Sequence, residues 1–453
     1  MYSGQLRVLM LSGWYYPDSI GGTERYVHAL ARLLLTRGHE VTVAAPSGAE
    51  ERYFFEGVPV YRYPVSERPS RAEVRGEAPP AYLDVFRVFL DDYRPDIVHM
   101  HSVTRGCGFY HALSIKQAGL PLVLTIHVPG VTCVRGTLMR WGSRPCDGLM
   151  RVRRCGACLL HQHGLPRPLG WWVASLPPNV SAALARGGGR WGSLVGTSGY
   201  LVEWMNRTRR LLDLPDRIVI VAQWLRDVLV RNGVAAHKLL LSRHGLPATP
   251  SRLPRRSPPL PGQPLRIGYI GRFDPVKGVH VLVEAVRRLP PSPPIELRLY
   301  GVAHGPEAQR YLARLRAAAE GDRRIVFSGE LSDEHRWDIL ADLDILAVPS
   351  LCLETGPLVV LEAFAAGLPV VGSKLGGVAE LVSDGQNGIL LPPGDVYAWA
   401  RAFQRLASEP HLLTALTAGI PRVRSSLAVV EEMLHLYAGL LDAHKPKSKA
   451  FRS

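Results

Sequence analysis

One stretch decides the fold: residues 344–372 read DILAVPSLCLETGPLVVLEAFAAGLPVVG. Its apolar run at 345–348 ends at a proline and is typical of a buried parallel strand. A helix is expected next, because Gly356 and Pro357 suit a helix start and Gly367 suits a helix end. Since another apolar run follows that glycine, the stretch predicts a β-α-β unit of an α/β fold.

Two glutamates flank the start of this expected helix. Glu354 precedes it, and Glu362 lies about five residues inside it, roughly 7–8 Å further along the axis. The helix start at Gly356, Pro357 and Leu358 offers free N–H groups and a positive dipole end to an anionic ligand. Carboxylates on either side can accept hydroxyl protons from sugars, so a nucleotide sugar is expected here. The alternative is that Glu354 only complements the helix dipole and Glu362 is a solvated helix residue.

Further motifs follow the helix. EAFAAGLPVV begins at Glu362, GGVAE occupies 376–380 and DGQNGILLPPGD occupies 384–395. Together with the spacing of Glu354 and Glu362, these motifs resemble the donor-site signature of retaining glycosyltransferase family 4. The resemblance implies a GT-B fold, α/β with two Rossmann-like doubly wound domains that face each other across a cleft. It also implies that Glu362 holds a ribose and that Glu354, with the N–H groups after Gly356, holds sugar hydroxyls.

Length and composition fit a globular protein of two or three domains. The chain has 453 residues, of which 47% are hydrophobic. No apolar run approaches the ~20 residues of a membrane-spanning helix, and the first residues alternate like a strand instead of forming a signal peptide. We therefore expect a cytoplasmic protein.

The charge of the chain indicates an anionic partner. A net charge of +15 suits nucleic acid, a membrane surface or a phosphorylated substrate. No nucleic-acid-binding signature accompanies this charge, so we expect no nucleic-acid partner.

The first residues predict a doubly wound domain. A strand at 6–12, a glycine-containing loop, a helix to Leu35 and a strand at 39–46 follow one another. Gly21 and Gly22 let the backbone approach a ligand at the helix N-terminus, although tight turns use the same residues. A full G-x-G-x-x-G fingerprint is missing, which argues against an NAD enzyme. The resemblance implies that this loop lies against the donor phosphates.

Three histidines stand at the ends of two further expected strands, where an open α/β sheet binds its ligands. His99 and His101 belong to the strand at 95–101, and His127 ends the strand at 120–127. Such histidines are more often structural, which we expect of His99 and His101. The resemblance implies that His127 faces the transferred sugar.

Four of the six cysteines fall within 26 residues: Cys133, Cys146, Cys155 and Cys158. Disulfides are disfavoured in a reducing cytoplasm, whereas a C-x-x-C pair preceded by two more cysteines fits a tetrahedral thiolate site. We therefore expect a structural zinc ion. Free thiols and redox chemistry are the alternatives.

Residues 151–210 form the most basic stretch, with nine arginines, one acid and four tryptophans. Tryptophan rings prefer the boundary between lipid headgroups and acyl chains, so we expect this stretch to dock on anionic lipid. The protein would then be peripheral on the inner face of the membrane, close to a lipid-linked acceptor. The alternatives are a solvated arginine-rich surface and an internal packing element.

A linker rich in proline, serine and arginine at 248–264 leads into the second domain. The first strand of that domain runs into a loop with Arg272 and Lys277, which is either a solvated basic loop or a phosphate-binding one. Fixed cations stabilise a departing phosphate, and the G-R-x4-K-G spacing resembles the family's diphosphate clamp. The D-x-D pair of Asp342 and Asp344 lies where a helix meets a strand, so we expect no catalytic metal.

The patterns divide the chain into a first domain at 1–247, the linker, a second domain at 265–422, a helix at 423–443 and a basic tail at 444–453. The resemblance implies that the first domain is on the acceptor side, that the second binds the donor, and that the helix at 423–443 packs back on the first domain. His244 stands near the end of the first domain, where the family usually has an asparagine.

We expect a retaining, metal-independent hexosyltransferase-type enzyme. It would move a sugar from a nucleotide-diphospho-sugar, taken as UDP-linked, to a glycan or lipid-linked acceptor, with His127, Arg272, Lys277 and Glu354 as catalytic residues. No residue is an obvious covalent nucleophile, which favours departure and attack on the same face. The alternatives are an epimerase or phosphorylase on the same fold, or a non-catalytic protein that binds a glycan or an anionic surface.

Overall fold

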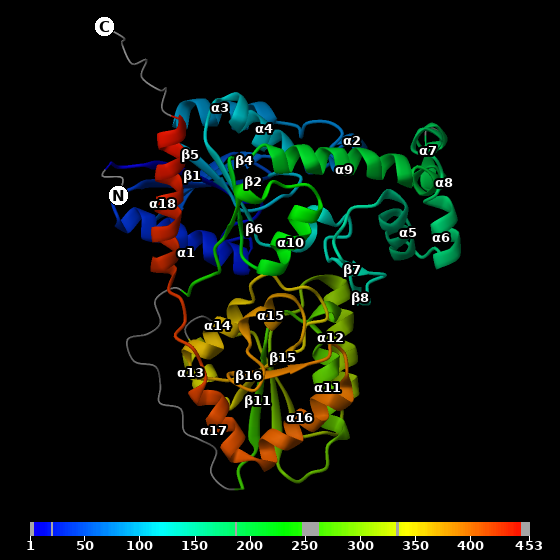
Figure 1. Ribbon diagram of the computed structural model, residues 1–453, viewed down its shortest axis with the longest axis vertical. Coiled ribbons are helices and arrows are strands. Elements are labelled where there is room, and N and C mark those ends of the chain that lie inside the picture. Colours follow the sequence, from blue (N-terminus) through cyan, green and yellow to red (C-terminus); the bar gives the residue numbers. More distant parts are fainter. Residues whose placement is uncertain (1–3, 20, 186–187, 247–261, 332–334, 445–453) are drawn as a thin grey trace. The chain divides into compact units, whose positions relative to one another are not determined.

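The chain folds into two compact units, Met1–His244 with Ser426–Ser453, and Gly245–Ser425 (Figure 1). The computed structural model describes residues 4–19, 21–185, 188–246, 262–331 and 335–444. Most of the expected linker and the expected basic tail beyond His444 lie outside the described residues. Each unit is described by itself below.

Within the described residues, the first unit is built on an eight-stranded sheet with the order β10-β9-β6-β5-β1-β2-β4-β3. Neighbouring strands are parallel, except for the antiparallel pair of β3 and β4. The winding reverses between β1 and β5, and ligands of open α/β sheets bind where the winding reverses. The strands are β1 (Arg7–Leu11), β2 (Glu40–Ser47), β3 (Glu51–Phe55), β4 (Val58–Pro64), β5 (Ile97–Met100), β6 (Leu122–Ile126), β9 (Arg217–Ile220) and β10 (Leu239–Leu241).

Helices cover both faces of this sheet, because its strands are apolar on both sides. One face packs against α3, α4 and α10, and the other packs against α1 and α18. The helices are α1 (Gly22–Thr36), α2 (Arg71–Arg75), α3 (Leu83–Tyr93), α4 (Phe109–Gln117), α10 (Gln223–Arg231) and α18 (Ser426–His444).

Helix α18 belongs to the first unit, although the second unit precedes it in the chain. Its Val430, Met433 and Tyr437 are buried beside α1 on the face of the first sheet. The hydroxyl of Tyr437 lies 2.6 Å from Nδ1 of His99 on β5, which ties the helix to the strand. The helix begins at Ser426, three residues later than the sequence predicts, and residues 420–424 form no helix.

The basic stretch at 151–210 forms a group of helices, none of which the sequence patterns predict. Gly156 and Gly199 allow close packing, since a Cβ there would come within 3.0 Å of Ala174 Cβ or within 3.0 Å of the Pro178 carbonyl oxygen. The group lies at one end of α9, whose other end packs on the sheet through Leu211 (Figure 1). The helices are α5 (Val152–Gln162), α6 (Arg167–Val173), α7 (Pro178–Ala185), α8 (Gly189–Val195) and α9 (Thr197–Asp213), preceded by the hairpin β7 (Met139–Arg140) and β8 (Arg144–Pro145).

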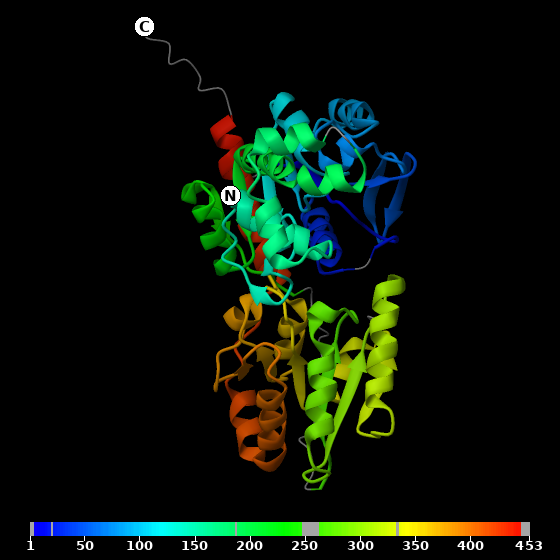
Figure 2. The same ribbon diagram turned by 90° about the vertical axis from the view of Figure 1, so that its right-hand side faces the viewer.

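The second unit contains a six-stranded parallel sheet in its described residues, with the order β13-β12-β11-β14-β15-β16. One face packs on α11, α12, α16 and α17 (the last two orange in Figure 2), and the other on α13, α14 and α15. The strands are β11 (Leu265–Ile270), β12 (Ile295–Tyr300), β13 (Ile325–Gly329), β14 (Ile345–Val348), β15 (Val370–Ser373) and β16 (Gly388–Leu391). The helices are α11 (Val279–Arg288), α12 (Gly305–Ala319), α13 (Arg336–Ala341), α14 (Leu358–Ala365), α15 (Gly376–Leu381), α16 (Val396–Ser408) and α17 (Pro410–Ala418).

The D-x-D pair is engaged by arginines of this sheet. Asp344 is fully buried, and its carboxylate accepts hydrogen bonds from the backbone N–H of Arg266 at 2.8 Å and from the guanidinium of Arg266 at 3.0 and 3.1 Å. Asp342 is half exposed and binds Arg266 and Arg298. Both carboxylates therefore help to link β11 and β12 to the residues that precede β14.

These two carboxylates predict different costs of substitution. Asp344→Ala leaves the Arg266 guanidinium without its buried partner and is expected to lower the free energy of unfolding by about 3–5 kcal/mol. Asp342→Ala removes a solvent-screened partner and is expected to cost less than about 1 kcal/mol. Urea unfolding of the two variants measures the difference, and equal losses would contradict the assignment.

Candidate functional site

The winding of the second sheet reverses between β11 and β14, and this brings two loops together. Lys277 ends the loop after β11, and Glu354 lies in the loop after β14. Their Nζ and Oε1 atoms are 2.6 Å apart, and the Ser350 hydroxyl donates to the same oxygen at 2.7 Å. Two residues that the sequence places 77 positions apart therefore form one ion pair at the carboxyl edge of the sheet.

The charges of this pair sustain each other. Burial acts to raise the pKa of the Glu354 carboxyl, but the Lys277 ammonium outweighs burial and holds that pKa below its ordinary value. Burial acts to lower the pKa of Lys277, and Glu354 reverses this effect and raises it. Both groups are consequently charged at neutral pH.

Glycines allow the surrounding loops to approach this pair. Gly278 has a φ of +73°, and a Cβ there would lie 2.1 Å from the carbonyl oxygen of Pro349. A Cβ on Gly377 would lie 2.6 Å from the carbonyl oxygen of Thr355, and the Gly377 N–H donates to the Glu354 carbonyl at 2.6 Å. The glycines of the two sequence motifs are thus required by backbone contacts around Glu354.

Glu362 is not a solvated helix residue, so that alternative is wrong. It lies on α14, is 7% exposed, and its Oε2 atom is 3.1 Å from Nη1 of Arg336 at the start of α13. Sequence reasoning missed Arg336, which is itself buried and belongs to no motif. Arg272 is exposed in the loop after β11, close enough to Glu354 to lower the pKa of that carboxyl further.

Helix α14 begins at Leu358 and presents its N-terminus near Glu354. Pro357 precedes the first helical residue, with φ of −67° and ψ of 103°, so the sequence places the helix start one residue too early. The extended ψ of this proline turns the chain into the helix. The expected donor-binding residues Gly356, Pro357 and Leu358 therefore all lie at the helix mouth.

In the first unit, three histidines form a hydrogen-bonded row near the reversal between β1 and β5. His127 Nε2 lies 3.3 Å from His101 Nδ1, and His127 Nδ1 lies 3.3 Å from His244 Nε2. The Tyr26 ring of α1 contacts His127 edge-on, with centroids 4.8 Å apart. Both ring nitrogens of His127 thus face another imidazole, and only 7% of the residue is exposed. His244 takes part in this row at the position where the resembled family has an asparagine.

His99 has the structural role that the sequence predicts. Its ring is fully buried and its nitrogens lie 2.6 Å from the Tyr437 and Thr125 hydroxyls. His101 differs, because its Nε2 atom is buried without a hydrogen-bond partner.

Gly21 and Gly22 stand at the N-terminus of α1, as the sequence predicts. A Cβ on Gly21 would lie 2.7 Å from the carboxylate of Glu24, which accepts a hydrogen bond from the Ser19 hydroxyl. Glu24 was missed by sequence reasoning, and it gives Gly21 a packing role as well.

The four clustered cysteines line one pocket of the first unit, together with three arginines of the same segment.

The tryptophans of the basic stretch differ in how exposed they are. Trp171 packs against Trp141 and Arg153, whereas Trp172 and Trp191 are 68% and 81% exposed.

Models of two glycosyltransferase domains match the chain. A model described as Glycosyltransferase Family 4 matches residues 20–170, and one described as Glycosyl transferases group 1 matches residues 264–409. The first match covers Gly21 and His127, and the second covers Arg272, Lys277, Glu354 and Glu362.

Several curated proteins with similar sequences are named as glycosyltransferases or glycogen synthases. A D-inositol 3-phosphate glycosyltransferase of Stackebrandtia nassauensis is 34% identical over 36% of this chain and 39% of its own length. The chain spans 39% to 46% of the length of four such enzymes. A glycogen synthase of Mycobacterium tuberculosis is 26% identical over 89% of the chain and 87% of its own length.

A solved structure shares the fold. HepE of Anabaena, solved with UDP and glucose, superimposes with a TM-score of 0.62 at 17% identity, covering 96% of this chain and all of that one. The two parallel-sheet units thus make up a GT-B fold.

Buried histidines predict acid sensitivity. Burial lowers the pKa of His99 and His111 to about 3 and places those of His101 and His127 well below the ordinary value. Below a pH of about 6.5 the unfolded chain binds more protons than the folded one, so the free energy of unfolding falls as pH falls, by up to about 1.4 kcal/mol per pH unit for each histidine. Above a pH of about 6.5 these histidines are neutral in both states and leave the free energy of unfolding unchanged.

Urea unfolding at pH values near 7.5 and 5.5 measures this loss. His99→Gln keeps hydrogen-bonding groups in place without the titration and is expected to show a smaller loss. Equal stability of the wild-type protein at both pH values would contradict the prediction.

Proposed function

Because the chain belongs to glycosyltransferase family 4, we propose that it is a retaining glycosyltransferase that moves a sugar from a nucleotide-diphospho-sugar to a glycan or lipid-linked acceptor. The Lys277–Glu354 ion pair, at the reversal point of the second sheet and beside the N-terminus of α14, is the observation that carries this proposal. Cations, a helix N-terminus and carboxylates are what a diphosphate between two polyols requires. UDP is the proposed nucleotide, because the related fold of HepE was solved with UDP and glucose.

Each group of the second unit has a part in this reaction. The diphosphate departs with negative charge, which Arg272 and Lys277 neutralise. An ammonium has three N–H donors, so Lys277 can orient Glu354 and still donate to a phosphate oxygen. Glu354 accepts from sugar hydroxyls, and Glu362, fixed by Arg336, accepts from the ribose.

Sugar transfer needs no catalytic metal in this proposal, since fixed cations take the charge of the leaving group. The acceptor attacks and the diphosphate departs on the same face of the sugar, because none of the residues assigned to the site is an obvious covalent nucleophile.

Release of nucleoside diphosphate tests the proposal. Purified protein is incubated with UDP-, GDP- and ADP-glucose, with and without candidate acceptors, and the released diphosphate is measured. Arg272→Ala and Lys277→Ala are each expected to lower kcat/KM by roughly 10²–10³, the scale for loss of one charge stabiliser of a transition state. Arg287→Ala, at the far end of α11, is the matched control and is expected to keep the wild-type rate.

Other outcomes point to the alternatives. Binding of nucleotide sugar without turnover favours a non-catalytic binding protein. Conversion of the sugar without an acceptor product favours an epimerase, and a strict need for phosphate favours a phosphorylase.

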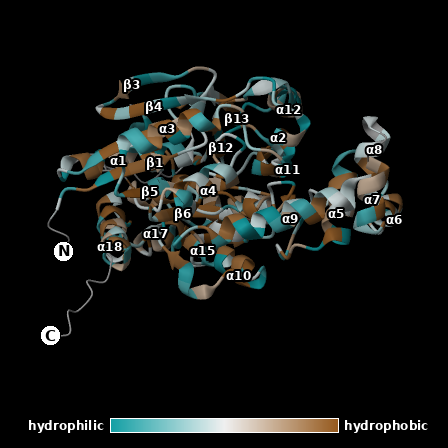
Figure 3. Ribbon diagram, turned by 90° about the horizontal axis from the view of Figure 1, so that it is seen from above, coloured by the Kyte–Doolittle hydropathy of each residue, from teal (hydrophilic) through white to brown (hydrophobic). Residues whose placement is uncertain are grey.

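The acceptor is proposed to lie at a membrane surface, reached through helices α6 to α8. No helix in the described part of the chain has the length and apolar character to cross a bilayer. Large apolar side chains are nevertheless exposed on these three helices: Leu169, Trp172, Val180, Leu184 and Trp191. Figure 3 shows brown, hydrophobic segments on α6 and α7. Arg167 is exposed on α6, and exposed Arg153 on α5 lies over the Trp171 ring of α6. A surface for anionic lipid combines such charges with apolar side chains.

The structure separates these arginines from others in the stretch. Arg207 donates to the carbonyl oxygens of Arg75 and Gly76, and Arg210 lies 4.9 Å from the Phe109 ring. These two arginines hold α9 in place, so they are poor probes of lipid binding.

Liposome sedimentation measures the docking. Wild-type protein is expected to pellet with anionic vesicles at low salt and to be released at high salt, because each arginine contributes ~1 kcal/mol that decays within a Debye length. Trp172→Ser with Trp191→Ser is expected to weaken pelleting, and Phe54→Ser, an exposed aromatic on β3, is the control. If the amount of pelleted protein did not depend on lipid charge or on salt, the membrane proposal would be wrong and a soluble acceptor would be favoured.

A further inference from the structure

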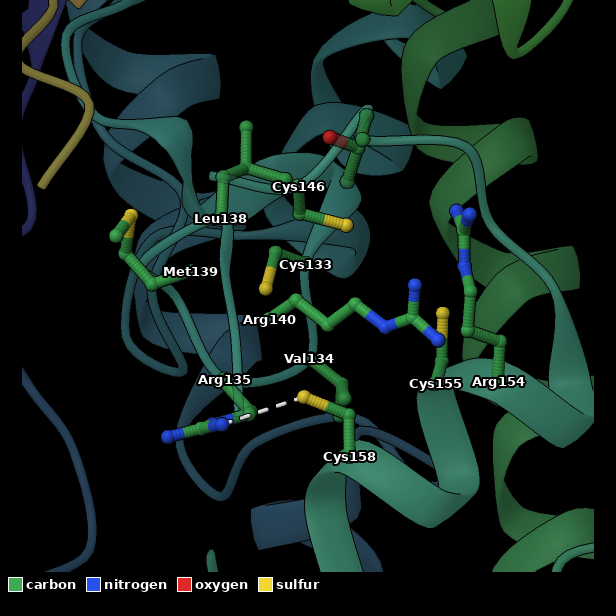
Figure 4. Close-up of a pocket in the computed structure, with 12 residues that line it drawn as sticks. Cys133, Val134, Arg135, Leu138, Met139, Arg140, Cys146, Arg154, Cys155 and Cys158 are labelled. Carbon is green, nitrogen blue, oxygen red and sulfur yellow. Dashed lines mark hydrogen bonds between the residues drawn. The ribbon is translucent and has the colours of Figure 1, made fainter. Parts of the chain in front are cut away.

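Four cysteines from three separate parts of one segment meet around a single pocket (Figure 4). Cys133 follows a short 3-10 helix, and Cys146 follows β8. Cys155 and Cys158 both lie on α5, one turn apart. All the residues that line the pocket belong to the range 132–158, so the pocket is a feature of this segment alone.

Two of the sulfur atoms accept hydrogen bonds from N–H groups. The backbone N–H of Arg151 donates to Cys155 Sγ at 3.4 Å, and that of Trp141 donates to Cys158 Sγ at 3.3 Å. The guanidinium of Arg135 also donates to Cys158 Sγ, at 3.2 Å. N–H groups that point at a sulfur atom in this way can keep donating to it when the sulfur is a metal ligand, and such contacts orient the ligand.

Arginines around the pocket have unused donors. The Nε atoms of Arg135, Arg140 and Arg154 are buried and have no hydrogen-bond partner. Asp147 binds Arg154 through the terminal nitrogens, at 2.8 Å for Nη1, and does not reach Nε. Buried donors are rarely left without a partner, so three such groups around four thiols indicate that hydrogen-bond acceptors, as metal-bound thiolates would be, belong in this pocket.

We propose that Cys133, Cys146, Cys155 and Cys158 hold one structural zinc ion and that the surrounding arginines neutralise the charge of this site. Four thiolates on a divalent cation carry a net negative charge, which matches the excess of guanidinium groups. Each thiol releases its proton to solvent when it binds the metal.

Zinc binding has to draw the sulfur atoms together. Among the described residues, no group of three or more potential ligands is already arranged to hold an ion. Figure 4 shows the Cys158 sulfur directed toward Arg135, away from the other three. Rotation of its side chain toward Cys155 brings the two α5 sulfurs to the same side of the helix, where the metal would join them at about 2.3 Å each.

The proposed ion would fix the base of the α5–α8 group. The chain before α5 is held to α10, since Asn232 binds the Gly148 carbonyl and the Met150 N–H, both at 2.9 Å. A metal that links Cys133 and Cys146 to α5 would join this anchored loop to the helices that present Trp172 to the solvent. This role is independent of the proposed transferase activity.

Metal content tests the proposal on the full chain. Purified wild-type protein is expected to contain about one zinc per chain, and removal with a strong chelator is expected to lower its melting temperature, with recovery when zinc alone is added. Cys155→Ser with Cys158→Ser is expected to abolish zinc binding, whereas Cys107→Ser, whose thiol binds the Ser102 carbonyl inside the core, is expected to keep it. Should the double variant fail to fold, cobalt substitution of wild-type protein gives the absorption of tetrahedral thiolate coordination.

The arginines provide a second test. Arg140→Met is expected to weaken zinc binding by roughly 10- to 100-fold, the usual effect of removing a group that supports metal ligands. Arg144→Met is the matched control, because Arg144 is exposed on the same hairpin and does not line the pocket. The proposal would be overturned if purified wild-type protein contained no zinc and its melting temperature did not change with a chelator. It would also be overturned if the mass of the protein showed disulfides among these cysteines.

Discussion

The second unit depends on a single contact between opposite charges, Lys277 against Glu354. Neither side chain could remain largely buried and charged without the other, since an unpaired ion in that position would lose its hydration without compensation. The pair can form because β11 and β14 are neighbours in the sheet and the chain leaves them in opposite directions. Gly278, Gly376 and Gly377 allow the loops to close around it. The ion pair is thus the point at which topology, backbone conformation and charge meet.

Sequence reasoning succeeded where a feature is encoded locally. The strand, turn and helix at 345–365 follow from apolar runs, a proline and glycines, and the structure differs by one residue at the helix start. The GT-B fold was also predicted correctly, because the donor motifs are dense and ordered.

What the sequence could not provide depends on distant contacts. Arg336 supports Glu362 from 26 residues away, with no motif around it. The row of His101, His127 and His244 requires the register of β5 and β6 and the path of the chain beyond β10. Helices α6 to α8 have only seven or eight residues each and are separated by glycines and prolines, so their packing against one another, and not a repeating apolar pattern, gives them their structure.

The placement of α18 has a consequence for how the protein is made. The chain leaves the first unit at His244 and returns to it at Ser426, so the two units are not consecutive in the order of synthesis. While a ribosome is still producing the second unit, one face of the first sheet lacks the apolar cover of Val430, Met433 and Tyr437, and His99 lacks its tyrosine partner. The second unit can therefore complete its core during translation, whereas the first unit, although it is made first, is finished last.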